Sequence, residues 1–239
     1  MRRSTLALAT ATGAALLTAA ALPATAQPTV HLAPTAAAQG AGLQEGTVGA
    51  AALLAKLKGC AQLSHGKYRT DEETSASVPV CGKNGAVFWK ADMDIDCDGR
   101  TTSKCNADTD PWYQDDTAFH QSDGEPLSAE RLPYVVVPSA SGIWNYASAG
   151  IKGGGVVAVI YRDQVEYAVV GDTGPDKIIG EASYATARGL GIDPDPATGG
   201  TDSGVTYLLF KNSRATPIES HSDAVSRGDA LAKKFLQDN

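Results

Sequence analysis

Two carboxylates, Asp172 and Glu181, stand nine residues apart at points where strands are expected to end. A buried strand leads to Asp172, and the following Thr173-Gly174-Pro175 turns the chain back towards Glu181. Glycosidic cleavage needs two such groups, because one carboxylic acid protonates the leaving oxygen while the other activates water or attacks. The two residues are therefore a candidate catalytic pair. The same spacing also fits two carboxylates that only cap a turn and a helix.

The sequence leaves open which of the two carboxylates is the acid. A helix expected over 182–188 would begin beside Glu181. A helix N-terminus stabilises an anion and lowers a nearby pKa, which favours Glu181 as the base and Asp172 as the acid. An apolar wall around Glu181 would reverse these roles.

Three aspartates, Asp92, Asp94 and Asp96, alternate with apolar residues along a strand expected over 86–95. Because side chains alternate along a strand, the three carboxylates share one face and repel one another unless a cation lies there. The amines of a cationic substrate would supply that charge. A solvated strand edge that carries charge against aggregation is the alternative.

A calcium loop is a third interpretation of this acidic strand. Asp94-x-Asp96-x-Asp98-Gly99 matches the opening of such a loop, but the twelfth position holds Cys105 where Glu is expected. Binding of substrate amines therefore fits better, and the four histidines are scattered. We predict no metal and no cofactor. The residues assigned to substrate binding are Asp92, Asp94, Asp96, Lys90 and Thr173.

The charge balance of the 239 residues excludes several classes of partner. The chain has 27 acidic and 20 basic side chains, for a net charge of −7. Neutralising phosphates or anionic lipids needs clustered Lys and Arg, so we expect neither a nucleic-acid nor a membrane partner. We expect a monomer.

The first 26 residues read as a secretory signal peptide. Arg2 and Arg3 precede an uncharged run rich in Ala and Leu, and Ala24-Thr25-Ala26 supplies a small-x-small cleavage pattern. We predict a secreted, extracellular protein with a flexible leader over 27–46 and one catalytic domain over 47–239. Removal of the signal peptide takes the net charge to −9.

Export makes the four cysteines candidates for disulfides. Of the three possible pairings we predict the sequential one, Cys60 with Cys81 and Cys97 with Cys105. The second bridge would tie a short loop directly after the acidic strand. A zinc site is the alternative, but the chain has no CxxC pair to support it.

The remaining pattern predicts an α+β fold in which strands dominate the centre and helices flank it. We expect helices over 47–58, 182–188 and 222–236, the last with Ser222 as N-cap. Strands are expected over 86–95, 134–137, 155–161, 165–170, 178–179 and 205–211. The pattern predicts a small, mostly antiparallel β-barrel with peripheral helices.

Several long motifs resemble the fungal-type chitosanases of glycoside hydrolase family 75. They are VFWKADMDIDCDG (87–99), LPYVVVP (132–138), VVGDTGP (169–175) and IGEAS (179–183). The resemblance implies endo-hydrolysis of the β-1,4 linkages of chitosan and glucosamine oligomers with inversion. It also places the family's essential Asp and Glu on Asp172 and Glu181. The strand–DTG pattern is similar to double-psi barrels of other polysaccharide-cleaving enzymes.

Two other classes of function remain open. Asp172-Thr173-Gly174 after a hydrophobic strand also fits an aspartic peptidase, but the chain has one copy and would have to work as a homodimer. A non-catalytic polysaccharide-binding protein would bind the polymer without cutting it. Four aromatic residues, Trp89, Trp112, Tyr113 and Tyr134, are candidates for stacking on sugars, although core positions are the more frequent role of such side chains.

Overall fold

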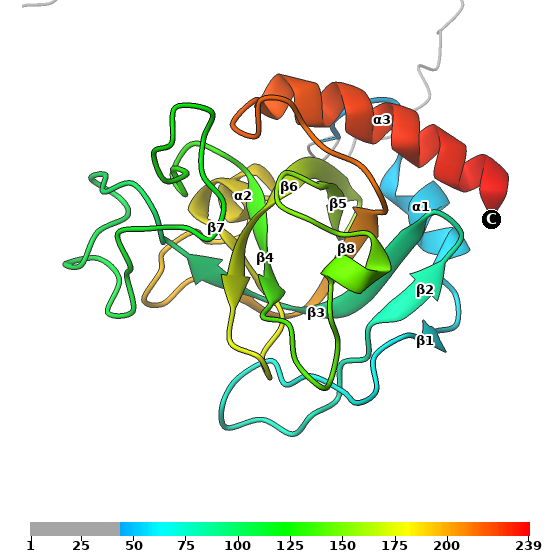
Figure 1. Cartoon of the computed structure of the whole chain (residues 1–239), viewed down its shortest axis with the longest axis horizontal. Coiled ribbons are helices and arrows are strands. Elements are labelled where there is room, and N and C mark those ends of the chain that lie inside the picture. Colours follow the sequence, from blue (N-terminus) through cyan, green and yellow to red (C-terminus); the bar gives the residue numbers. More distant parts are fainter. Residues whose placement is uncertain (1–43) are drawn as a thin grey trace, which may run out of the picture. The chain divides into compact units, whose positions relative to one another are not determined.

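The computed structural model of the chain describes residues 44–239 (Figure 1). The predicted signal peptide and most of the predicted leader lie outside these residues. The last residues assigned to the leader are part of the fold, because Gln44 forms a β-bridge with Val165 and the Glu45 N–H donates to the Val165 carbonyl at 3.0 Å. The ordered domain therefore begins before residue 47.

Six strands close into a barrel, which confirms the predicted architecture. In ring order they are β3 (Ala86–Asp96), β7 (Glu181–Ser183), β4 (Tyr134–Pro138), β6 (Gln164–Gly174), β5 (Val156–Tyr161) and β8 (Thr201–Phe210), and β8 pairs again with β3. Four of the six pairings are antiparallel, while β3–β7 and β4–β6 are parallel. Two short strands, β1 (Ala61–Gln62) and β2 (Cys81–Lys83), extend the sheet beyond β3.

The barrel interior is apolar and draws buried side chains from all six strands. Examples are Trp89, Met93, Val135, Val159, Val170, Ala182 and Tyr207. The rings of Trp89 and Tyr207 stack with centroids 5.4 Å apart. Trp89 is thus a core residue, and so is the fully buried Tyr134. Both were candidates for sugar stacking, and their burial removes them from that role.

Helices cover the outside of the barrel. Helix α3 (His221–Asp238) runs along one side of it and α1 (Ala50–Lys56) lies next to α3, while α2 (Tyr184–Gly189) follows β7 (Figure 1). A short 3-10 turn, η1, spans Ala147–Ala149.

The prediction of Ser222 as the N-cap of the C-terminal helix is wrong. Ser220 caps α3, because its hydroxyl accepts a hydrogen bond from the Asp223 N–H at 3.2 Å. None of the helices in residues 44–239 is long and apolar enough to cross a membrane.

The return from Asp172 differs from the prediction in one respect. Ile178 forms only an isolated bridge with Arg69, and the returning strand is β7, which begins at Glu181. Helix α2 therefore starts after Ser183, whose hydroxyl accepts a hydrogen bond from the Thr186 N–H at 3.3 Å. Glu181 consequently lies in a strand and not in the first turn of a helix.

Both predicted disulfides are present, Cys60–Cys81 and Cys97–Cys105. The second one ties the start of the long connection over 97–133, which links β3 to β4. Two backbone N–H groups of that connection, those of Gln114 and Ala118, contact carboxylates described below. The disulfide thus constrains a segment that borders the candidate site.

Candidate active site

The predicted pair lies on the outer face of the barrel, on strands separated by β4. Ala182 points into the barrel opposite Val135, so the preceding residue Glu181 points outwards. Asp172 on β6 is paired with Val136, whose side chain packs on the outer side of the barrel, so Asp172 also points outwards. Because β4 lies between β7 and β6, the two backbones are two strand spacings apart, about 9–10 Å.

A bulge in β6 gives Asp172 this orientation. The β4–β6 register passes from Val135 opposite Val170 to Val136 opposite Asp172, which leaves Gly171 unpaired. Simple alternation would turn Asp172 inwards with Val170, whereas an extra residue reverses the face. Gly171 fits here because a Cβ at this position would lie only 2.6 Å from the Tyr134 Cβ. The bulge thus moves a carboxylate from the core to the outer face.

Glu181 leans across β4 towards the same part of β6. A Cβ on Gly174 would collide with the Glu181 Oε2 and would also lie 3.0 Å from the Val136 Cγ1. Gly174 follows Asp172 by two residues, about 7 Å along the strand. The structure therefore brings the two predicted carboxylates to one short stretch of surface.

The two carboxylates have different environments. The pKa of Glu181 is raised to about 7 by burial and then by the neighbouring carboxylates Asp94, Asp98 and Asp172. No N–H among residues 44–239 donates to its carboxylate. Near neutral pH, Glu181 in the free protein therefore carries a proton for a large part of the time.

Asp172 is buried, with 6% exposure, but its anion is stabilised by hydrogen bonds. Its Oδ1 accepts from the Ala118 N–H at 2.8 Å and from the Thr173 N–H at 2.6 Å. Burial raises the pKa of Asp172 above its ordinary value, and these two N–H groups make the rise smaller. Asp172 is thus the better stabilised anion of the two.

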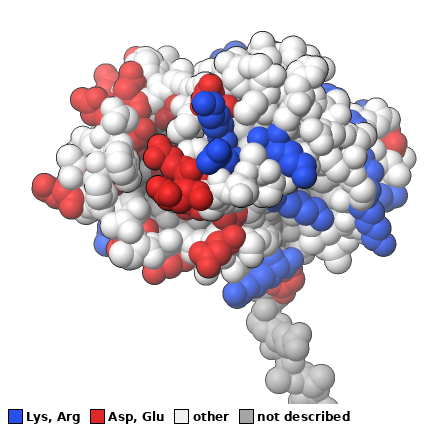
Figure 2. Space-filling view, turned by 90° about the horizontal axis from the view of Figure 1, so that it is seen from below, with Lys and Arg blue, Asp and Glu red and all other residues white. Residues whose placement is uncertain are grey.

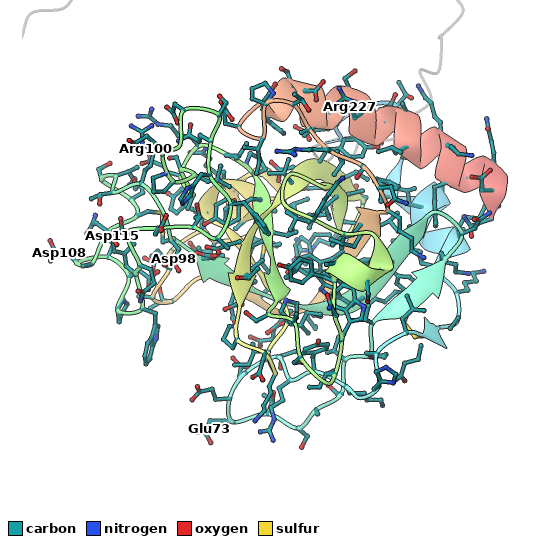
Figure 3. The ribbon with its side chains drawn as sticks, viewed as in Figure 1. Glu73, Asp98, Arg100, Asp108, Asp115 and Arg227 are labelled. Carbon is teal, nitrogen blue, oxygen red and sulfur yellow. A yellow bond between two sulfur atoms is a disulfide. The ribbon has the colours of Figure 1, made fainter. Side chains whose placement is uncertain are left out.

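Asp96 and Asp98 extend the acidic group along β3 and past its end. The Asp98 Oδ1 accepts from the Gln114 N–H at 2.6 Å, and burial raises the pKa of Asp98 to about 7. Burial, with Asp98 and Asp172 nearby, raises the pKa of Asp96 well above its usual range. Figure 3 shows Asp98 close to the barrel, with Asp108 and Asp115 farther out in the long connection.

Asp92 and Asp94 form a second acidic group with Asp71, a residue that no sequence pattern indicated. One carboxylate oxygen from each of the three lies within 4.8 Å of the others. Asp92 is 4% exposed, and burial followed by Asp94 raises its pKa to about 8. Acidic side chains gather on one part of the face in Figure 2, and Lys and Arg on another. Asp71 lies on an irregular loop, where no sequence periodicity marked it.

The face predicted for the three aspartates is correct, since Ala91 and Met93 belong to the interior core. Asp92 is nevertheless buried, so a fully solvated strand edge does not describe it. The carboxylates that lie close enough to share an ion are those of Asp71, Asp92 and Asp94. A calcium loop would instead use Asp94, Asp96 and Asp98 as ligands.

Other predicted site residues lie at varying distances from the pair. Thr173 is next to Asp172, and its N–H is one of the donors to that carboxylate. Lys90 is exposed on β3 four residues before Asp94, about 13 Å along the strand, so it is not brought to the pair.

Trp112 is 84% exposed in the long connection, and the hydroxyl of Tyr113 donates to the Gly99 carbonyl at 2.7 Å. Two pockets, of about 260 and 390 Å³, are lined by residues outside the pair.

Comparison with known proteins gives one consistent family. Endo-chitosanase C of Aspergillus oryzae is 32% identical over 136 residues, which are 55% of this chain and 33% of that protein. Endo-chitosanase B of Aspergillus oryzae (strain ATCC 42149 / RIB 40) is 31% identical over 161 residues, 60% of this chain and 67% of the relative. An endo-chitosanase of Aspergillus fumigatus is 34% identical over 138 residues, 52% and 58% of the two chains.

Among solved structures, the Streptomyces papain inhibitor aligns over 56% of this chain and all of its own, with 16% identity and a TM-score of 0.32, which is too low to support an argument. The family model described as fungal chitosanase of glycosyl hydrolase group 75 matches residues 93–235, a range that holds Asp94, Asp96, Asp172 and Glu181. This match covers more than half of the sequence, and the chain therefore belongs to the fungal chitosanase family of glycosyl hydrolase group 75.

Proposed function

We propose that the protein is a secreted endo-chitosanase that hydrolyses the β-1,4 linkages of chitosan. The observation that carries this proposal is a pair of carboxylates in unlike environments, with further carboxylates around them. Among the described residues, no Lys or Arg forms an ion pair with any of these carboxylates. Family membership and the names of the relatives support it. The matched region spans a third of the length of Endo-chitosanase C, so the activity of this chain is a proposal.

Glu181 is the better candidate for the general acid and Asp172 for the general base. An acid must hold a proton at the working pH, and Glu181 has a pKa of about 7. A base must stay ionised, and two N–H groups stabilise the Asp172 anion. The sequence favoured the opposite roles because it placed Glu181 at a helix start. The strand environment of Glu181 removes that argument.

The placement of the pair favours inversion over retention. Inverting glycosidases hold their carboxyl groups about 6.5–9.5 Å apart so that a water fits, whereas retaining enzymes hold them about 5–5.5 Å apart. Here a complete strand, β4, separates the two backbones. In the proposed reaction a water molecule attacks the anomeric carbon while Asp172 removes a proton from that water. Glu181 gives its proton to the departing glycosidic oxygen.

The surrounding carboxylates would hold the substrate through its ammonium groups. Asp92, Asp94 and Asp96 were assigned to this role from the sequence, and we add Asp71 because it lies with Asp92 and Asp94. Bringing a cation to these carboxylates lowers the cost of their mutual repulsion, so a protonated glucosamine residue is favoured over a neutral acetylated one.

Two other functions stay as alternatives for the test. A non-catalytic polysaccharide-binding protein would bind chitosan and release no reducing ends, and a single-DTG peptidase would digest casein. A reducing-sugar assay on soluble chitosan beside a casein digest separates all three.

The first prediction concerns the pair. Asp172→Asn and Glu181→Gln each remove a proton-handling group and change the shape little, so turnover of chitosan should fall by about 10²–10⁴-fold while the melting temperature changes little. Asp176→Asn is the matched control, because Asp176 is exposed and lies between the pair in the chain. Near-normal turnover in either pair variant would move the chemistry to other carboxylates.

The second prediction concerns the acidic strand. Asp94→Asn should raise KM for chitosan several-fold and weaken the dependence of KM on salt, since one screened attraction is lost. Because Asp94 also raises the pKa of Glu181, kcat should stay nearly unchanged only at pH values well below 7, where Glu181 keeps its proton in both proteins. Asp163→Asn removes the same charge from the exposed β5–β6 turn and is the control. Equal effects of the two variants would mean that only net charge matters.

The third prediction concerns stereochemistry. Hydrolysis of a β-linked glucosamine oligomer should first release the α-anomer, which proton NMR detects before mutarotation, because the attacking water approaches from the face opposite to the leaving group. Initial release of the β-anomer would mean a covalent glycosyl-enzyme intermediate and would contradict the proposed role of Asp172.

A further inference from the structure

A second group of side chains that bind metals lies away from the acidic face. Glu45, Glu166 and His221 come from three separate segments: the start of the described chain, β6 and the first residue of α3. One ligand atom from each lies within 4.8 Å of the other two. No sequence pattern indicated this group, because its members are far apart in the chain.

Glu166 is the residue that a simple salt bridge does not explain. It is only 3% exposed, and its Oε2 is buried without a hydrogen-bond partner among residues 44–239. None of the ion pairs among these residues includes Glu166. An unpaired buried carboxylate is costly, and a cation bound beside it offsets that cost.

The other two residues are already held in position. The Glu45 Oε2 accepts from the Tyr167 N–H at 2.7 Å, and the Glu45 Oε1 lies 3.0 Å from the His221 Nε2. The Tyr167 N–H fixes the Glu45 carboxylate as hydrogen bonds commonly fix a metal ligand, and a bound Zn²⁺ would displace the proton between the Glu45 Oε1 and the His221 Nε2. The His221 side chain is 36% exposed, which leaves a route from solvent.

The ligand set selects the class of ion. Ca²⁺ and Mg²⁺ prefer oxygen ligands alone, whereas one imidazole with two carboxylates suits Zn²⁺. Zinc bonds of about 2.0–2.2 Å in a tetrahedron place neighbouring ligand atoms roughly 3.3–3.5 Å apart, close to the separation of Glu45 and His221. We propose that Glu45, Glu166 and His221 form a Zn²⁺ site, with water as the fourth ligand, that fastens the start of the domain and α3 to β6.

This site is separate from the proposed catalytic pair. Glu166 and Asp172 are six residues apart on β6, about 20 Å along the strand. Zinc at Glu166 is therefore expected to act on stability and not on the hydrolytic step. The proposal does not depend on the proposed activity.

The test is thermal unfolding of the chelator-treated, tag-free protein with added Zn²⁺, Ca²⁺ or Mg²⁺, beside calorimetric titration with Zn²⁺. We expect one Zn²⁺ per chain and a rise in Tm of roughly 5–10 °C at a free concentration a hundred times Kd, with little response to Ca²⁺ or Mg²⁺. Glu166→Gln and His221→Gln should each abolish the rise. His221 is partly exposed, so its variant remains informative if Glu166→Gln does not fold.

Two control variants locate the ion. His120→Gln removes the exposed His120–Asp116 pair, and Asp71→Asn alters the other carboxylate group. Both should keep the full response to Zn²⁺. No stoichiometric binding, or an unchanged rise in Tm in His221→Gln, would overturn the proposal. Loss of the response in Asp71→Asn alone would place the ion on the acidic face and would overturn it equally.

Discussion

Burial of several neighbouring carboxylates is the constraint on which the proposed site depends. Burial raises the pKa values of Glu181, Asp96 and Asp98, and the nearby Asp172 carboxylate raises each of them further. A carboxylate whose pKa is raised on folding contributes stability that is present at low pH and is lost as the pH rises through the folded-state value, near 7 for Glu181. A polycationic ligand relieves this cost. Under the proposed function, the same arrangement would give both a proton on the acid and an affinity for protonated amines.

The barrel produces this crowding through the order of its strands. The parallel pairing of β3 with β7 sets Asp94 beside Glu181, and β4 then spaces Glu181 from Asp172. The bulge at Gly171 turns Asp172 outwards, and the absence of a side chain on Gly174 leaves room for Glu181. The apolar interior carries none of these groups. The carboxylates of the proposed site therefore lie on the outer side of the barrel wall.

The sequence predicted the barrel class, both disulfides and the common face of the aspartates, because each depends on local alternation, spacing or a long motif. The catalytic roles of Asp172 and Glu181 stay predictions. Contacts between segments that are far apart in the chain could not be predicted from these patterns. Asp71 lies in an irregular loop, and Glu45, Glu166 and His221 meet only in the folded chain. The start of α2 was misplaced because Glu181, Ala182 and Ser183 suit a helix but pair with β3 and β4 instead. Trp89 shows that a tryptophan next to an acidic run can still be a core residue.

The proposed acid–base assignment is tested most directly by titration of the Glu181 side-chain carboxyl carbon by NMR in the free protein, assigned with Glu181→Gln. If Glu181 is the acid and Asp172 the base, the Glu181 pKa should be about 7, Asp172 should ionise at lower pH, and Asp98→Asn should lower the Glu181 pKa because one like charge is removed. A Glu181 pKa near the ordinary value of about 4.3 would contradict it. An Asp172 pKa above that of Glu181 would reverse the proposed acid and base.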